Sequence, residues 1–266
     1  MGTEHTASEQ NPGRGNTRAG KCAKHGAYVD VWQSAIGPLP ARWEGCPKCL
    51  DERSRAAHEA EQKRYYEQQR AEMVAARMDY SCIPERFISK SFDDYQPVNA
   101  SAAKALKSVR RYAENAASDN HGGQSIMLCG KVGAGKTHLS CATLKYVIEQ
   151  TAMPCRYMTF SEIVRLVKET FQRDSKKTEK EVYEKLGSLR LLVIDEVGMQ
   201  NATEFERTVA YEAINARYLN MLPTMIISNL NPKGIEECLG DRVVDRLREN
   251  NGVYVMFDWD SYRKQS

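Results

Sequence analysis

Residues 130–137 have the composition of a loop that holds phosphate. The segment Gly-Lys-Val-Gly-Ala-Gly-Lys-Thr fits the pattern G-x-x-x-x-G-K-[S/T] at every fixed position. Glycines let the backbone curl so that its N–H groups face phosphate oxygens, and a following helix adds partial positive charge. The pattern predicts that Lys136 contacts the β and γ phosphates of ATP and that Thr137 binds Mg²⁺. The candidate nucleotide contacts are Gly130, Lys131, Val132, Gly133, Ala134, Gly135, Lys136 and Thr137.

Two acids follow an apolar run farther along the chain. Residues 191–194 are Leu-Leu-Val-Ile, and Asp195 and Glu196 come directly after them. A buried strand of a parallel sheet would place both acids at its carboxyl end, where ligands bind in such folds. We expect Asp195 to hold Mg²⁺ through water and Glu196 to act as the general base toward the attacking water. This pair favours hydrolysis over transfer to an acceptor; the alternative is an ordinary strand end with a solvated acidic turn.

Asn229 is a further candidate, because it follows the apolar run at residues 224–228. Its amide could orient the attacking water beside the γ-phosphate. The alternative is an asparagine that simply serves a turn, since asparagine tolerates left-handed backbone conformations.

Apolar runs alternate with helical patterns through the rest of the chain, and together they would position these residues. Strands are expected at residues 125–129, 156–160, 189–194, 224–228 and 253–257, with helices at 101–117, 136–150, 161–171 and 204–219. This alternation predicts an α/β fold with an open five-stranded parallel sheet flanked by helices. The polar residues 172–180 are expected to form a mobile loop. Cys129, Cys141 and Cys155 lie in apolar or helical contexts and are expected in the core.

Two short pairs of potential metal ligands lie near the amino terminus. Cys22-x-x-His25 and Cys46-Pro47-x-Cys49 are separated by residues 26–45. Four thiolate or imidazole ligands with no open position are typical of structural Zn²⁺. With few apolar side chains, this segment should not hold a fold without the metal. Four unrelated residues are the alternative.

The composition divides the chain into four parts. Residues 1–20 are polar and should be disordered, residues 21–50 form the zinc module, and residues 83–266 form the ATPase domain. Between them, residues 51–82 lack glycine and proline and alternate acids with bases. This predicts a long exposed helix with charge pairs at i,i+4. We expect the zinc module and this helix together to dock a partner. Deleting residues 1–80 should then abolish partner binding and spare ATP binding.

The bulk composition is that of a soluble protein. The 266 residues are 41% hydrophobic and 27% charged, and the formal net charge of +3 permits only a local basic patch. No apolar stretch is long enough to span a bilayer, and the amino terminus lacks an apolar signal core. These features predict a cytoplasmic protein without a membrane partner.

Residues 83–263 resemble the DnaC/DnaI-type helicase loaders, a branch of the AAA+ ATPases. The resemblance starts at Ile83-Pro84-Glu85-Arg86-Phe87 and Phe92-Asp93-Asp94-Tyr95 and includes the phosphate loop. The more specific matches are residues 240–247 and 257–263, which read Gly-Asp-Arg-Val-Val-Asp-Arg-Leu and Phe-Asp-Trp-Asp-Ser-Tyr-Arg. DnaI-type and phage-encoded loaders carry a zinc module, whereas the best-known DnaC-type pattern lacks this zinc pair.

The resemblance implies roles that spacing alone does not show. Asn229 matches the sensor-1 position, Arg246 the arginine finger that reaches a neighbouring subunit's nucleotide, and Arg263 the sensor-2 arginine. Arg217 and Arg242 are weaker candidates for the finger, and surface ion pairs are the alternative for Arg246 and Arg263. A cation placed on the transferring phosphoryl group lowers the barrier strongly.

The resemblance also implies a homo-oligomer when ATP is bound, which loads a hexameric replicative DNA helicase onto single-stranded DNA. We expect residues 157–168 and the loop after Phe171 to face the DNA, the loop through Arg173, Lys176, Lys177 and Lys180. A solvated charged loop is the alternative. Two alternatives remain open: an IstB-like transposition ATPase that binds DNA and a transposase, and an adaptor that uses ATP only as a switch.

Overall fold

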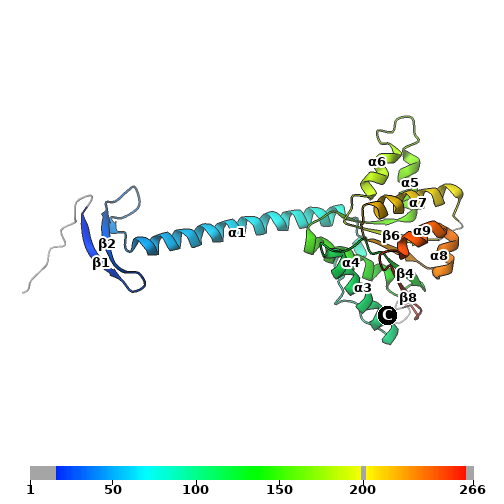
Figure 1. Cartoon of the computed structure of the whole chain (residues 1–266), viewed down its shortest axis with the longest axis horizontal. Coiled ribbons are helices and arrows are strands. Elements are labelled where there is room, and N and C mark those ends of the chain that lie inside the picture. The colour runs from blue at the N-terminus through cyan, green and yellow to red at the C-terminus, as the bar shows by residue number, and fades with distance from the viewer. Residues whose placement is uncertain (1–15, 199–201, 262–266) are drawn as a thin grey trace, which may run out of the picture. The chain divides into compact units, whose positions relative to one another are not determined.

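The computed structural model describes residues 16–198 and 202–261, and the chain divides into two units between Gln69 and Arg70. The larger unit is built on a five-stranded parallel sheet, in the order β5-β6-β7-β4-β8. The strands are β4 (Ile126–Gly130), β5 (Cys155–Thr159), β6 (Leu191–Val197), β7 (Thr224–Ser228) and β8 (Val253–Phe257). The expected five-stranded parallel sheet is therefore confirmed (Figure 1).

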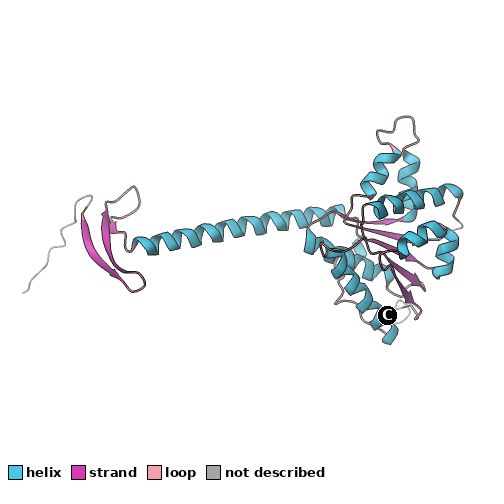
Figure 2. Ribbon diagram, viewed as in Figure 1, coloured by secondary structure: helices cyan, strands magenta, loops and turns pink. Residues whose placement is uncertain are grey.

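Helices cover both faces of this sheet (Figure 2). Because side chains alternate along a strand, Leu191 and Val193 pack with α3 (Ala100–Ala117) and α4 (Lys136–Thr151) on one face. Leu192 and Ile194 pack on the other face with α5 (Phe160–Glu169), α6 (Glu179–Leu186), α7 (Glu204–Leu219), α8 (Pro232–Leu239) and α9 (Asp241–Arg248). The short helix α2 (Glu85–Ile88) precedes α3. Cys129, Cys141 and Cys155 are fully buried, as expected.

Several elements differ from the sequence-based expectation. Strand β6 does not stop at Ile194 but continues through both acids to Val197, with a register shift against β7 between Ile194 and Val197. The segment 172–180, expected as a loop, contains the start of α6. Thr178 and Glu181 form a reciprocal capping box there, which begins the helix. Helices α8 and α9 were not predicted, because each is only eight residues long.

The smaller unit contains a three-stranded antiparallel sheet of β1 (Thr17–Cys22), β2 (Gly26–Gln33) and β3 (Arg42–Trp43). The expectation of a disordered tail through residue 20 is wrong for Thr17–Gly20, because these residues pair with β2. Residues 1–15 lie outside the described part of the chain. Trp32 and Trp43 make an edge-to-face contact at 5.2 Å between ring centroids.

Helix α1 (Pro47–Tyr80) follows this small sheet and crosses the boundary between the units. It starts before the expected residue 51, so Cys49 lies in its first turn. Charge pairs at i,i+4 were expected, and Arg55 pairs with Asp51 at 2.8 Å and Lys63 with Glu67 at 3.9 Å. Among the described residues, no helix has the length and apolar character needed to cross a membrane.

Candidate functional site

The phosphate loop connects the end of β4 to the first residue of α4, as its sequence predicts. Gly130, Gly133 and Gly135 all have positive φ, at 123°, 78° and 96°. A Cβ atom at Gly130 would collide with the carbonyl group of Phe257, and one at Gly135 with the ring of Tyr95. These glycines therefore permit both the curl of the loop and the close approach of its neighbours.

Lys136 begins α4, and its ammonium group lies inside the curl of the loop. Its Nζ donates to the carbonyl oxygens of Gly130 and Lys131, each at 2.7 Å. Burial lowers the pKa of Lys136, while the nearby Asp195 carboxylate acts in the opposite direction. A partly desolvated cation at this position is well placed to receive phosphate oxygens.

The carboxylate of Asp195 is buried and accepts three hydrogen bonds. Its Oδ2 accepts from Thr137 Oγ1 at 3.1 Å and from the Tyr157 hydroxyl at 2.5 Å, and its Oδ1 accepts from the Glu196 N–H at 2.6 Å. Burial raises the pKa of Tyr157, so its phenol remains a neutral donor. A hydroxyl and a carboxylate oxygen side by side are the hard ligands that Mg²⁺ prefers.

Glu196 follows Asp195 but points in a different direction. Its φ is +62°, in the left-handed region that non-glycine residues rarely adopt, and its side chain is exposed. The irregular pairing of β6 with β7 occurs here, and such irregularities re-aim side chains near functional sites. One carboxylate is thus buried among hydrogen-bond donors while its neighbour remains available for proton transfer.

A cavity of about 760 Å³ brings these groups together. It is lined by Lys136, Thr137, Asp195, Glu196 and Asn229, which come from the phosphate loop after β4 and from the carboxyl ends of β6 and β7. Asn229 is exposed directly after β7. The sequence motifs that were expected to share one site therefore do lie around one cavity.

Other residues of the cavity were missed as site residues by sequence reasoning. Tyr95 OH and Trp259 Nε1 both donate to the Ala134 carbonyl, at 3.2 and 3.1 Å, and so brace the phosphate loop from outside. Arg86 and Phe87 line the cavity as well. These four lie in segments noted only for their resemblance to a family. Tyr157 had no such signal, because a tyrosine within a strand is ordinarily a packing residue.

Comparison with known proteins agrees with this geometry. The family model described as IstB-like ATP binding protein matches residues 58–266. The chain belongs to this family. With its phosphate loop, paired acids and parallel sheet, this IstB-like protein is an ATPase of the AAA+ type.

Curated relatives of this IstB-like protein carry a more specific name. A protein named replicative helicase loader DnaC from Buchnera aphidicola subsp. Acyrthosiphon pisum is 35% identical over 184 residues, 69% of this chain and 73% of that protein. The protein of the same name from Escherichia coli K12 is 31% identical over 175 residues, 66% of this chain and 69% of that protein. The resemblance to helicase loaders is thus confirmed.

Solved structures share the fold of the ATPase unit. A crystal structure of the DnaC helicase loader matches with a TM-score of 0.58 at 23% identity, covering 65% of this chain and 98% of that one. AMPPCP-bound DnaA from Aquifex aeolicus matches with a TM-score of 0.55 at 21% identity, covering 68% and 52%. At these identities the likeness establishes the fold alone.

The arginines expected to complete the site of the IstB-like protein lie in different surroundings. Arg246 is on α9 and does not line the nucleotide cavity of its own chain. Its Nη2 donates to the Tyr211 hydroxyl at 2.9 Å, and its guanidinium lies 4.4 Å from the Tyr211 ring centroid and 5.5 Å from that of Tyr218. Its Nη1 is buried without a hydrogen-bond partner among the described residues. Arg242 is exposed, and Arg263 lies outside the described residues.

Arg217 does not fit the role of an arginine finger, so its inclusion among the candidate fingers was wrong. Its side chain is fully buried. The guanidinium donates to Thr224 Oγ1 at 2.8 Å and to the carbonyls of Leu186, Leu189 and Pro223. Burial lowers its pKa to about 10. Arg217 therefore ties α6, α7 and the start of β7 together inside the IstB-like domain.

Part of the surface expected to face DNA is also buried. Tyr157 is buried and donates to Asp195, which lines the cavity, and Ile163, Val164 and Val167 pack into the core. Arg165 and Lys168 remain exposed on α5. Phe171 is 61% exposed and contacts Phe205 edge to face at 6.1 Å.

The four expected zinc ligands converge in the smaller unit. The ligand atoms of Cys22, His25, Cys46 and Cys49 all lie within 4.8 Å of one another. His25 Nδ1 lies 3.8, 3.6 and 3.3 Å from the sulfurs of Cys22, Cys46 and Cys49. Tetrahedral bonds of about 2.3 Å to sulfur and about 2.0 Å to nitrogen give similar ligand separations. The donor set and its spacing therefore fit Zn²⁺.

Two further features prepare this cluster for a metal. Backbone N–H groups of His25 and Lys24 lower the pKa of the Cys22 thiol, which favours a thiolate at this position, while the hydrogen bond with Cys22 raises the pKa of the neighbouring Cys49 thiol. The other ring nitrogen of His25, Nε2, lies 3.0 Å from Glu52 Oε1. A carboxylate behind a ligating histidine fixes its tautomer and orientation. Glu52 was not singled out from the sequence, where it is one of many acids on α1.

Proposed function

We propose that this chain is an ATP-dependent helicase loader, which delivers a hexameric replicative DNA helicase onto single-stranded DNA when replication begins. Two observations together support this proposal. The residues expected to bind and hydrolyse ATP line one cavity. Curated relatives of the ATPase domain, at 31 to 35% identity, are named replicative helicase loaders. The family description alone does not separate this function from an IstB-like transposition ATPase, but these relatives favour the loader. Such work belongs in the cytoplasm.

The side chains around the cavity divide the work of hydrolysis. Backbone N–H groups of residues 130–137 and the Lys136 ammonium would hold the phosphates of bound ATP. Thr137 and Asp195 would hold Mg²⁺, which would neutralise phosphate charge. Tyr157 and the Glu196 N–H keep the Asp195 carboxylate in one orientation. Glu196 accepts a proton from the attacking water, and Asn229 orients that water.

Arg246 completes the site of a neighbouring subunit in an ATP-bound oligomer, and Arg263 acts on its own subunit's nucleotide. The Nη1 of Arg246 is buried without an acceptor among the described residues. An orphaned donor is expensive, and this cost favours a rearrangement of the side chain that brings the guanidinium to an acceptor in the assembly. Arg246→Ala should leave ATP binding intact and reduce turnover only in the oligomer. Mixing Arg246→Ala subunits with Glu196→Gln subunits should restore part of the turnover, because each active interface takes one intact group from each chain.

Single-stranded DNA is proposed to contact the exposed face of α5 and the residues after it. Arg165 and Lys168 supply positive charge, and Phe171 with Phe205 supplies aromatic faces for stacking. Lys168 Nζ lies 5.6 Å from the Phe205 ring centroid, so the positive charge and the aromatic rings are close enough to contact the same segment of DNA. Phe171→Ala should weaken binding of oligothymidylate about tenfold or more, in line with the loss of one stacked base.

The zinc module and the first part of α1 are proposed to dock the helicase. Tyr65 and Tyr66 are 60% and 69% exposed on α1, which is more aromatic surface than a solvated helix needs. The deletion test must stop at residue 69, because Val74 and Met78 pack into the ATPase core and the Ser81 carbonyl accepts from the Tyr157 N–H. Residues 70–266 should bind ATP and fail to bind helicase.

Co-purification decides between the proposed functions. The full chain, tagged and loaded with ATP or ADP, is offered a hexameric replicative helicase and, separately, an IS21-type transposase. Retention of the helicase, stronger with ATP, supports loading. Retention of the transposase alone would contradict it.

A further inference from the structure

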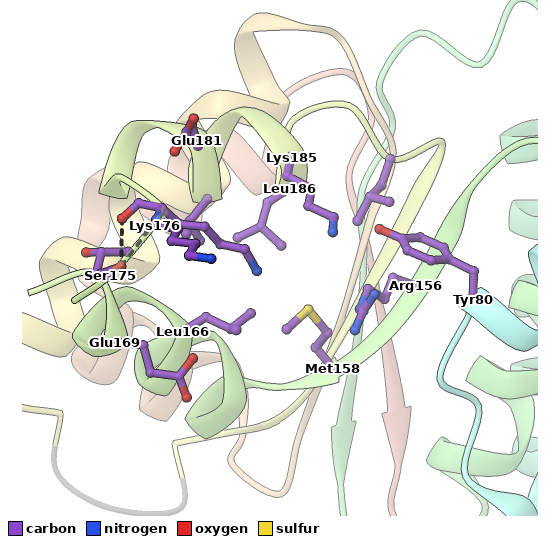
Figure 3. Close-up of a pocket in the computed structure, with 14 residues that line it drawn as sticks. Tyr80, Arg156, Met158, Leu166, Glu169, Ser175, Lys176, Glu181, Lys185 and Leu186 are labelled. Atoms are coloured by element: carbon purple, nitrogen blue, oxygen red, sulfur yellow. Dashed lines mark hydrogen bonds between the residues drawn. The ribbon is translucent and has the colours of Figure 1, made fainter. Parts of the chain in front are cut away.

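A second pocket, of about 500 Å³, lies in the ATPase unit beside the edge strand β5 (Figure 3). It is enclosed by α5, α6, β5 and Tyr80, and it shares no lining residue with the nucleotide cavity. Its inner surface is mostly aliphatic and is formed by Met158, Leu166, Val182, Leu186 and Leu189. Nothing in the proposed hydrolysis uses this pocket.

Positive charge surrounds this aliphatic surface. Arg156 and Lys185 lie over the same ring of Tyr80, at 4.9 and 5.6 Å from its centroid, and Lys176 and Lys177 also line the pocket. None of these four cations forms an ion pair within residues 16–198 and 202–261. Figure 3 shows Lys176 and Lys185 on the side of the pocket opposite Leu166 and Met158.

The acids of the pocket neutralise only part of this charge. Glu169 and Glu181 line its edge. The Glu181 carboxylate is held at the start of α6, where its Oε2 accepts from the N–H and Oγ1 of Thr178 at 2.7 and 3.1 Å. These hydrogen bonds also lower the pKa of Glu181. Four cations against two acids leave a net positive rim around an apolar interior.

We propose that this pocket docks an acidic peptide segment of a partner protein, with a leucine- or methionine-sized side chain in the interior and carboxylates on the rim. Apolar anchors in desolvated pockets supply most of the affinity of such contacts, and surrounding charges set specificity. Peptide binding in this pocket is independent of the proposed helicase loading, because the pocket includes neither the nucleotide cavity nor the zinc module.

The lining favours a peptide over single-stranded DNA. Bases bind by stacking on aromatic faces. Tyr80 is the one aromatic residue of the lining, and two cations already lie over its ring. The exposed Phe171 and its neighbour Phe205 do not line the pocket. An aliphatic interior suits an aliphatic side chain.

The test starts from a random peptide library displayed on phage and selected on the full-length protein. Counter-selection uses the double variant Lys176→Glu, Lys185→Glu, whose changes are on exposed side chains and should not disturb the fold. Peptides that combine acids with leucine, methionine or phenylalanine should be enriched. The proposal would be overturned if no peptide bound the wild-type protein better than the double variant. It would also be overturned if the enriched peptides lacked acids.

Binding of the enriched peptide, followed by fluorescence anisotropy, locates its site. Lys185→Glu should weaken binding at least about fivefold, and Leu166→Ser should do the same by removing apolar contact. The matched control is Lys180→Glu, because Lys180 lies on the same helix, is exposed and does not line the pocket. Equal weakening by Lys180→Glu would contradict the assignment.

A photo-crosslinking residue at position 166 distinguishes binding of a peptide in the pocket from binding of single-stranded DNA. Benzoylphenylalanine in place of Leu166 should crosslink to the enriched peptide, and excess oligothymidylate should not prevent it. Crosslinking to oligothymidylate and not to the peptide would assign the pocket to DNA and overturn the proposal. ATP binding by each variant, measured alongside, verifies that the ATPase unit is folded.

Discussion

Within residues 16–69 of the smaller unit only Asp30 and Cys46 are buried, whereas the larger unit buries two apolar clusters, one on each face of its sheet. Asp30 is itself polar and accepts from Arg18 and from the Gly45 N–H. One unit is thus stabilised by apolar burial, and the other by polar ties around four metal ligands. This difference means that the two units should respond to different perturbations.

Removal of zinc should have the largest effect, and it should be confined to the smaller unit. Structural zinc sites contribute about 10 kcal/mol or more to folding. Chelation, or Cys46→Ser, should therefore unfold residues 17–46. The indole N–H resonances of Trp32 and Trp43 report on this unit, and that of Trp259 on the other. The first two should collapse while the third persists.

Cys82→Ser is the matched control, because Cys82 is an exposed thiol outside the cluster. It should change none of the three resonances. If chelation also abolished the Trp259 signal and ATP binding, the two units would not be independent.

Arg217→Met should have the next largest effect, and it should be confined to the ATPase unit. The change leaves the carbonyls of Leu186, Leu189 and Pro223 buried without a donor. Each unsatisfied buried group costs about 1 to 3 kcal/mol. We expect the unfolding free energy from urea titration to fall by about 3 kcal/mol or more. Arg173→Met, on an exposed residue, should change it little; an equal loss would show that Arg217 has no special role.

Glu196→Gln should reduce ATP turnover by about two orders of magnitude and leave ATP affinity nearly unchanged. The reason is that Glu196 is exposed to the cavity and holds no other side chain in the described structure, so its removal affects proton transfer alone. Steady-state hydrolysis and equilibrium binding measure the two quantities. Turnover at the wild-type rate would favour an adaptor that uses ATP only as a switch.

Tyr157→Phe should have the smallest of these effects. It removes the hydrogen bond to Asp195 while keeping the ring in the sheet. A hydrogen bond to a charged group is worth about 1.5 to 3 kcal/mol, so affinity for Mg²⁺-ATP should fall at least about tenfold. Tyr183→Phe is the control, since its hydroxyl bonds to Glu179 away from the cavity. Unchanged Mg²⁺ dependence would show that Tyr157 only packs.

Sequence reasoning succeeded where local chemistry and local pattern coincide. The phosphate loop needs its glycines next to Lys136 and Thr137 in the chain, and Asp195 directly follows the apolar residues of the strand that positions it. The central strands were found because they are almost wholly apolar. The zinc ligands form two adjacent pairs, which the structure brings together at one point.

It failed where function or stability depends on contacts distant in sequence. Tyr157 and Asp195 are 38 residues apart and meet because β5 and β6 are neighbours. Arg217 looks like any charged residue of a helix, and only its burial shows its structural role. Helix α6 had a local signal in Thr178 and Glu181, but the polar composition around it favoured a loop. No sequence pattern indicated that Tyr80 lines a pocket or that a pocket lies beside β5.

The most direct test of the account is a calorimetric titration of the full-length protein with ATP and Mg²⁺. We predict uptake of one nucleotide per chain, which Lys136→Ala abolishes and which zinc chelation leaves intact. Absence of nucleotide binding by the intact wild-type protein, or equal binding by Lys136→Ala, would contradict it.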